Sequence, residues 1–249
     1  MAGLLSYLKV PAYAVSGFAT LASGALYWKQ KHVSPPIPSH PIPLQPCLLD
    51  LLTPTTCTCS ELIYPRYIPP GSRTEEGLPR PDQFGVTDWE DCKIITPDGE
   101  TLNAFLIRPS NPLLTRPVTV LMFHGNAGNI GHRVPIAKKL MEDNGCNILM
   151  LECRGYGLST GEPDEAGFII DAQTGLDYLR QHTTTKGNDV VVYGQSIGGA
   201  LAVQLVAKNL GAKDIKGLIL ENTFVSMRKL IPRYCLLTIA KMEADGQAV

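Results

Sequence analysis

The stretch Gly194-Gln195-Ser196-Ile197-Gly198 decides the fold of this chain. This G-x-S-x-G pattern follows an apolar run at residues 189–193 and precedes small residues that begin a helix near residue 199. A strand, a sharp turn with a strained serine at its apex and a departing helix together make a nucleophile elbow. The flanking glycines are then required, because a Cβ at either position would collide with neighbouring backbone. An ordinary glycine-containing turn is the alternative, and the surrounding strand and helix favour the elbow.

The composition indicates one sizeable domain with an appendage. The chain has 249 residues, a net charge of −1 and seven cysteines. Near-neutral charge without a basic stripe argues against binding of nucleic acid. The cysteines are odd in number and form neither a CxxC pair nor a Cys/His metal spacing, so we expect them to be mostly reduced. We expect no metal and no cofactor, and the oligomeric state is left open.

Residues 10–28, from Val10 to Trp28, are uncharged and mainly apolar, and lysines flank them on both sides. As a helix this run would be roughly 28 Å long, about the thickness of the hydrocarbon core of a bilayer. It predicts a single-pass membrane anchor in the endoplasmic reticulum or plasma membrane. The heavier positive charge after the run favours a cytoplasmic domain. A cleaved signal peptide is the alternative, since residues 22–24 are small enough for a cleavage site.

The next segment predicts a spacer. Six of the thirteen residues at 34–46 are proline, which excludes a regular helix and favours a stiff, extended linker. Residues 47–61 have no helical or strand period, and we assign them no structure. Residues 65–81 again carry proline and glycine at intervals and predict a second extended segment.

Strand and helix patterns alternate from Asp82 onward. Residues 92–96 and 102–108 predict two strands joined by a tight turn at 97–99. The apolar runs 118–123, 147–151, 189–193 and 218–220 predict strands covered on both faces. Two amphipathic helices lie between them, marked by apolar residues at helical spacing: Val134, Ala137, Leu140 and Met141, then Ile169, Ala172, Leu176 and Leu179. This order predicts an α/β fold with a mainly parallel sheet flanked by helices.

Ligands of such sheets lie at the carboxyl ends of the strands, so the loops after these strands should form one rim. The loop at residues 124–129 is glycine-rich, which lets backbone amides turn inward. An oxyanion hole needs two donors about 3 Å from the developing charge. We assign them to the backbone amides of Asn126 and Ile197. A glycine-rich connecting loop with a structural His124 is the alternative, and the adjacent elbow favours the oxyanion hole.

The remaining rim residues predict the walls of a substrate pocket. We assign this pocket to His124, Gly125, Gln195, Arg154 and Tyr156. For Arg154 the residue type favours a carboxylate or carbonyl partner over direct contact with substrate.

Three motifs in this order resemble a known family. They are HGNAGN at 124–129, RGYGLS-x-GEP at 154–163 and GQSIGG at 194–199, followed by the flank at 221–224. The match is similar to α/β-hydrolases of the bud-emergence (Bem-type) branch and covers residues 84 to about 232. The resemblance implies an α/β-hydrolase fold and a membrane-associated serine hydrolase, with Ser196 as nucleophile. Small acyl esters or thioesters, including acyl-proteins, would be the substrates.

The sequence departs from the family after the nucleophile. The triad of this fold runs Ser, then Asp or Glu, then His, yet all five histidines precede Ser196. The stretch from Asp82 is also shorter than the roughly 200 residues that a complete domain of this kind needs. We therefore expect a C-terminally truncated domain that lacks the last strands, impaired catalysis, and an exposed apolar edge at residues 218–220. The alternatives are a non-catalytic interaction or regulatory protein and an inactive truncated isoform.

The chain is thus expected to divide into four parts: a membrane anchor at 1–32, a proline-rich linker with an irregular insert at 33–81, a partial hydrolase domain at 82–232 and a divergent tail at 233–249.

Overall fold

A computed structural model describes residues 63–111 and 115–224. The predicted anchor at 10–28, the insert at 47–61 and the tail at 233–249 lie outside the described residues. Within the described ranges, no helix combines the length and apolarity needed to cross a bilayer.

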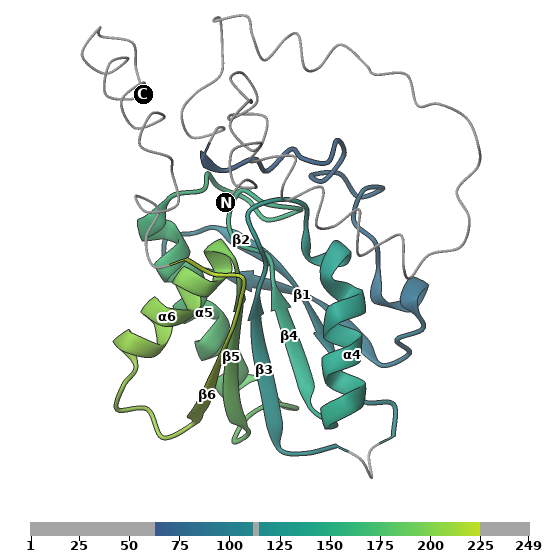
Figure 1. Cartoon of the computed structure of the whole chain (residues 1–249), viewed down its shortest axis with the longest axis vertical. Helices are drawn as coiled ribbons and strands as arrows, with labels where there is room; N and C mark the ends of the chain where they lie inside the picture. Colours follow the sequence, from purple (N-terminus) through teal and green to yellow (C-terminus); the bar gives the residue numbers. More distant parts are fainter. Residues whose placement is uncertain (1–62, 112–114, 225–249) are drawn as a thin grey trace, which may run out of the picture. The chain divides into compact units, whose positions relative to one another are not determined.

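The described strands form one sheet in the order β1-β2-β4-β3-β5-β6 (Figure 1). β2 runs antiparallel to both of its neighbours, whereas β4, β3, β5 and β6 are parallel to one another. The bounds of the strands are Trp89–Ile95 for β1, Thr101–Ile107 for β2, Val118–Phe123 for β3, Asn147–Leu151 for β4, Asp189–Gln195 for β5 and Ile215–Glu221 for β6. The predicted α/β architecture, mainly parallel, is therefore confirmed.

Helices cover both faces of this sheet because the central strands are apolar on both sides. In β3, Val120 and Met122 pack with α4 (Val134–Asn144), whereas Leu121 and Phe123 pack with α5 (Glu165–Gln181) and α6 (Ile197–Lys208). Short 3-10 turns at Pro81–Phe84 (η1) and Ile130–Arg133 (η3) complete the described helical elements. Asp164 caps α5 by accepting a hydrogen bond from the amide of Gly167.

The predicted core face of α5 is wrong at one position. Phe168, rather than Ile169, packs into the core with Ala172, Leu176 and Leu179, while Ile169 is only half-buried. Residues 168, 172, 176 and 179 follow one another at steps of three or four, which keeps them on a single helical stripe.

The carboxyl ends of the parallel strands lie level with one another. Phe123 is paired with Leu151 on one side and with Gly194 on the other, and Gly194 is paired with Leu220. The loops after β3, β4, β5 and β6 consequently meet at one edge of the sheet, as expected from the strand order.

Residues 63–80 differ from the predicted extended segment. They form successive turns that pack on the rim loops, and we call them the strap. The amide of Gly128 donates to the carbonyl of Ile68 at 2.7 Å, and the Asn129 side chain donates to the carbonyl of Ser72 at 3.0 Å. The prolines interrupt regular structure as predicted, but carbonyl groups of the strap accept hydrogen bonds from the domain.

β6 is longer than the predicted run at 218–220 and is the last strand of the described sheet. It pairs with β5, and within the described ranges no strand lies along its other side. Leu218, Ile219 and Leu220 are 38%, 42% and 43% exposed. The described sheet thus ends in an apolar edge.

Candidate active site

Ser196 occupies the turn between β5 and α6 with φ 53° and ψ −115°. A positive φ is rare for a residue with a side chain and costs free energy that the surroundings must offset. The end of β6 supplies this support: the Ser196 amide donates to the carbonyl of Glu221, and the Thr223 hydroxyl donates to the carbonyl of Ser196, both at 2.9 Å. The geometry is that of a nucleophile elbow.

The two glycines of the motif make this turn sterically possible. A Cβ added to Gly194 would lie 2.2 Å from the carbonyl oxygen of Gly198. A Cβ on Gly198 would lie 2.5 Å from the carbonyl oxygen of His124. Both distances are far below a van der Waals contact, so strand, helix and oxyanion loop approach one another only because these side chains are absent.

The loop at residues 124–129, which we call the oxyanion loop, runs beside the elbow. Among the described residues, no group accepts a hydrogen bond from the backbone amide of Asn126 or from that of Ile197. The Asn126 side chain is held from two directions: it donates to the carbonyl of Ile63, and its Oδ1 accepts from the Tyr156 hydroxyl, both at 2.7 Å. Side chains thus hold the loop at Asn126, while the amides of Asn126 and Ile197 have no hydrogen-bond partner among the described residues.

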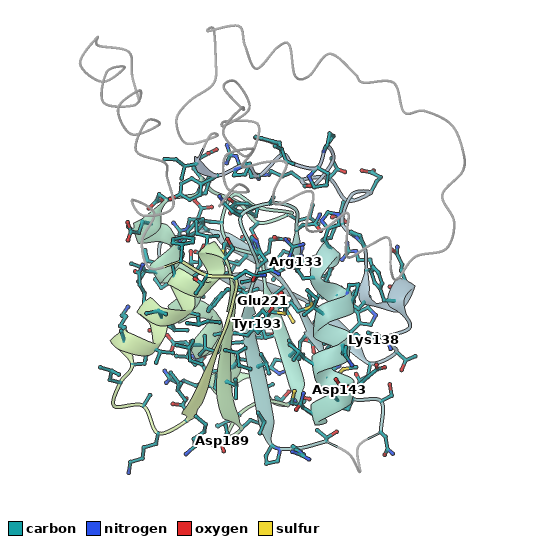
Figure 2. The ribbon with its side chains drawn as sticks, viewed as in Figure 1. Arg133, Lys138, Asp143, Asp189, Tyr193 and Glu221 are labelled. Atoms are coloured by element: carbon teal, nitrogen blue, oxygen red, sulfur yellow. The ribbon has the colours of Figure 1, made fainter. Side chains whose placement is uncertain are left out.

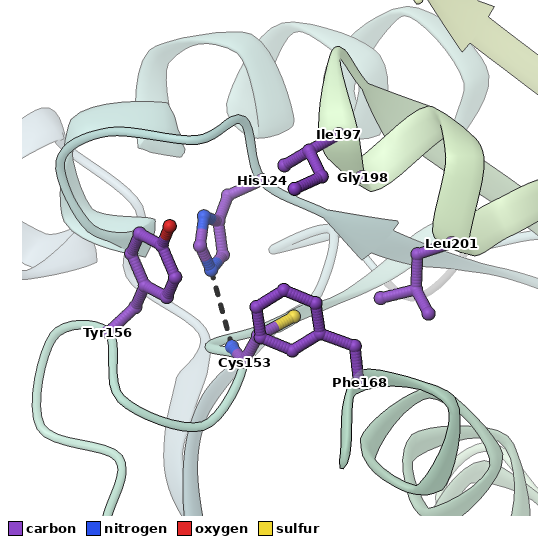
Figure 3. Close-up of a pocket in the computed structure, with 7 residues that line it drawn as sticks. All are labelled: His124, Cys153, Tyr156, Phe168, Ile197, Gly198 and Leu201. Carbon is purple, nitrogen blue, oxygen red and sulfur yellow. Dashed lines mark hydrogen bonds between the residues drawn. The ribbon is translucent and has the colours of Figure 1, made fainter. Parts of the chain in front are cut away.

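His124 is buried beneath this loop, and both of its ring nitrogens are engaged. Nδ1 lies 2.7 Å from the carbonyl oxygen of Gly125, and Nε2 accepts from the amide of Cys153 at 3.2 Å (Figure 3). Burial lowers the pKa of His124 to about 4. A neutral ring tied to two backbone groups agrees with a structural hydrogen-bonding role and disfavours a role as general base.

A small apolar cavity of about 10 Å³ lies next to Ile197 (Figure 3). It has room for roughly one water molecule. Its lining residues are His124, Cys153, Tyr156, Phe168, Ile197, Gly198 and Leu201.

The predicted pocket residues do not all meet at this cavity. His124 and Tyr156 line it, whereas Gly125, Gln195 and Arg154 do not. Gln195 adjoins Gly125 instead, since its Oε1 lies 3.2 Å from the position of an added Cβ at Gly125.

Arg154 is held by carboxylates, as its residue type favours. Its Nε donates to Oδ1 of Asp171 at 2.9 Å, and its Nη1 donates to Oδ2 of Asp98 at 2.7 Å. The hydrogen bonds from Arg154 lower the pKa of Asp98 to about 2. This network connects the turn between β1 and β2 with α5 and fixes the loop that begins at residue 154.

Glu152 is a buried acid that sequence reasoning missed. It follows β4 directly and is fully buried; its Oε2 accepts from the amide of Ile130 at 3.0 Å, and its Oε1 lies 3.3 Å from Nε2 of His124. Burial raises the pKa of Glu152 to about 8. The sequence did carry one signal for a buried acid, because Glu152 comes immediately after the apolar run at residues 147–151.

Glu221 is one of the acids that follow Ser196, and it is engaged elsewhere. The Tyr193 hydroxyl donates to its carboxylate, and buried Arg133 faces both groups (Figure 2). Burial raises the pKa of Tyr193. Among the described residues, no side chain forms a hydrogen bond with the Oγ of Ser196, so the elbow has no proton acceptor there.

Comparisons with known proteins agree with this geometry. The family model described as serine aminopeptidase, S33 (Hydrolase_4) matches residues 116–244. Protein bem46 of Schizosaccharomyces pombe is 47% identical over 171 residues, which cover 69% of this chain and 55% of that protein. The α/β-hydrolase domain-containing protein WAV2 of Arabidopsis thaliana is 40% identical over 139 residues, which cover 56% of this chain and 44% of that protein.

Among solved structures, an α/β-hydrolase from Vibrio vulnificus superposes with a TM-score of 0.58 at 22% identity, covering 84% of this chain and 71% of that one. This likeness supports the fold. The matched part of the chain spans about half the length of the two curated relatives.

Proposed function

Because the chain belongs to the serine aminopeptidase S33 (Hydrolase_4) family of α/β-hydrolases, in the Bem-type branch, we propose that it carries a serine-hydrolase site for acyl esters or thioesters. Ser196 is the nucleophile, and the amides of Asn126 and Ile197 are the oxyanion donors. One observation carries the proposal: a serine in a strained turn stands beside a loop in which the Asn126 amide has no hydrogen-bond partner among the described residues.

In the proposed reaction, Oγ of Ser196 attacks the acyl carbon, and the bond from this carbon to the alkoxide or thiolate leaving group breaks. The two backbone amides would stabilise the negative charge on the carbonyl oxygen by donating hydrogen bonds to it. The serine proton passes to a base, the leaving group takes up a proton, and water then hydrolyses the acyl-serine. The apolar side chains of Phe168, Ile197 and Leu201 beside the elbow favour an acyl group over a charged one.

The lack of a base next to Ser196 among the described residues bears on the expected rate. No histidine follows Ser196 in this sequence, and His124 is tied to backbone groups through both nitrogens. We therefore propose that Ser196 reacts slowly in this chain, with hydroxide removing its proton. Loss of a triad histidine typically lowers kcat by about 10⁴-fold or more.

A fluorophosphonate probe tests the nucleophile. We expect slow labelling of the full chain and none of Ser196→Ala, with Ser110→Ala, an exposed serine after β2, labelling like wild type. The labelling rate should rise by about tenfold per pH unit near neutrality, because the fraction of serine alkoxide does so. Equal labelling of wild type and Ser196→Ala would contradict the assigned nucleophile, and a rate that reaches a plateau near pH 7 would contradict the absence of a base.

A non-catalytic binding protein with the same fold is the second candidate. The lack of a described hydrogen bond to the Oγ of Ser196 favours it. The same variant separates the two functions: under the binding hypothesis Ser196→Ala keeps any cellular phenotype of the wild-type chain, and under the hydrolase hypothesis it loses that phenotype.

We further propose that residues 10–28 anchor the protein in a membrane, which the uncharged apolar run and its flanking lysines support. After extraction with alkaline carbonate, the full chain should stay in the membrane pellet. A variant with Phe18 and Leu21 replaced by aspartate should move to the supernatant, since charged residues at the centre of a membrane helix cost about 3 kcal/mol each. Recovery of wild type in the supernatant would contradict the anchor.

A further inference from the structure

The side chains of Glu152 and His124 meet in the interior beneath the oxyanion loop. Glu152 is 0% exposed, and His124 is 4% exposed. Gly157 packs directly against the Glu152 carboxyl group, since an added Cβ there would lie 2.1 Å from Oε2 of Glu152. Both groups are thus removed from bulk solvent, where a charge is costly unless it is paired, so the contacts between them decide which atoms carry the protons.

The protonation of His124 follows from its backbone partners. Nδ1 faces the carbonyl oxygen of Gly125 at 2.7 Å, and a carbonyl only accepts, so Nδ1 carries hydrogen. The amide of Cys153 donates to Nε2 at 3.2 Å, so Nε2 presents its lone pair. A doubly protonated ring would place two hydrogens against each other at Nε2. The ring is consequently neutral.

This tautomer determines the form of Glu152. Its Oε1 lies 3.3 Å from the Nε2 atom of His124, and no donor among the described residues bonds to it. An ionised carboxylate would face that lone pair with a buried oxygen left unpaired, which is costly. A proton on Oε1 removes both problems, because the hydroxyl can then share the Nε2 lone pair with the Cys153 amide in a three-centre hydrogen bond while Oε2 accepts from Ile130.

We propose that Glu152 is a protonated positioning residue that holds the oxyanion loop at both ends. Its carboxyl O–H donates a hydrogen bond to Nε2 of His124, and its other oxygen accepts one from the backbone amide of Ile130. The proposal rests on the function assigned above, because it concerns the loop that carries the Asn126 donor. Glu152 itself touches neither the nucleophile nor the proposed oxyanion site.

The charged and titratable groups around Glu152 fit a neutral carboxyl. Arg133 from η3 and Arg73 from the strap face it at longer range and favour its ionised form, but neither forms an ion pair with it. Arg133 donates instead to the carbonyl of Ala127 and faces Glu221. The other groups facing it are His124, Cys153 and Tyr156. Burial outweighs these influences and raises the pKa of Glu152 to about 8.

Glu152→Gln is the decisive variant, because a carboxamide reproduces a protonated carboxyl: its oxygen can accept from Ile130 and its NH₂ can donate to His124. Below about pH 7 we expect it to label at Ser196 within about twofold of wild type. The ratio of the Glu152→Gln rate to the wild-type rate should rise to about tenfold near pH 9, since only wild type ionises there. Glu152→Leu should label at least about tenfold more slowly throughout.

Hydrogen exchange separates this proposal from the proposed function. The amides of residues 125–130 should exchange more rapidly in Glu152→Leu than in wild type and at the wild-type rate in Glu152→Gln. Glu142→Gln, an exposed acid on α4, should change neither readout. If wild type is not labelled at all, the hydrolase function fails, while exchange still tests Glu152. Loss of loop protection in Glu152→Gln, or a ratio of rates that does not change with pH, would overturn the proposal.

Discussion

Gly194→Ala is expected to remove most of the stability of the protein. The added methyl carbon would lie 2.2 Å from the carbonyl oxygen of Gly198 and 2.6 Å from Cα of Gly199. These are backbone atoms of α6, so no side-chain rotation relieves the overlap. α6 cannot withdraw freely, because Gly198 is itself packed against the carbonyl of His124. We expect a loss above about 4 kcal/mol in the free energy of unfolding, a large part of the usual 5–15 kcal/mol.

Urea unfolding followed by far-UV circular dichroism measures this loss. Gly211→Ala is the matched control, because no atom lies within 4 Å of the added Cβ at this position after α6. Its free energy of unfolding should stay within about 0.5 kcal/mol of wild type. If the two variants were equally stable, the close contact between β5 and α6 would not be what requires glycine at residue 194.

The sequence predicted the central elements well because their physical signals are local. The runs 118–123 and 147–151 coincide with β3 and β4, since strands buried on both faces are apolar throughout. The elbow was equally local: five consecutive residues carry both the strained serine and the glycines that make room for it. β6 was predicted too short, because Ile215 and Lys216 lie before the continuous apolar run.

The features that the sequence did not reveal depend on contacts between distant residues. Glu152 meets His124 and Ile130 across two loops, and nothing in the spacing of these residues indicates that they touch. The strap was predicted to be extended because its prolines exclude regular structure, yet its carbonyls find donors in Asn126 and Gly128. Composition shows that a segment lacks a helix, but it does not show against which surface the segment packs.

The buried ion pair of Arg154 predicts the second large loss of stability, which follows from removing its partner Asp171. Its side chain is 7% exposed and lies between Asp98 in the turn after β1 and Asp171 on α5. Asp171 is the fully buried partner, and it also accepts from the backbone amide of Arg154 at 2.8 Å. It therefore neutralises the guanidinium and fixes the start of the loop that carries Tyr156. Removing Asp171 would leave a buried cation with only Asp98 at the rim.

Asp171→Ala should thus lower the free energy of unfolding by about 3–5 kcal/mol, the usual cost of removing one member of a buried ion pair. Asp177→Ala is the control on the same helix: its carboxylate is 47% exposed and pairs with Arg180 at i,i+3, so a loss of about 0.5 kcal/mol or less is expected. Urea titrations of both variants give the comparison. Equal losses would mean that Asp98 alone satisfies Arg154, and the loop beside the elbow would then depend on the turn after β1 instead of on α5.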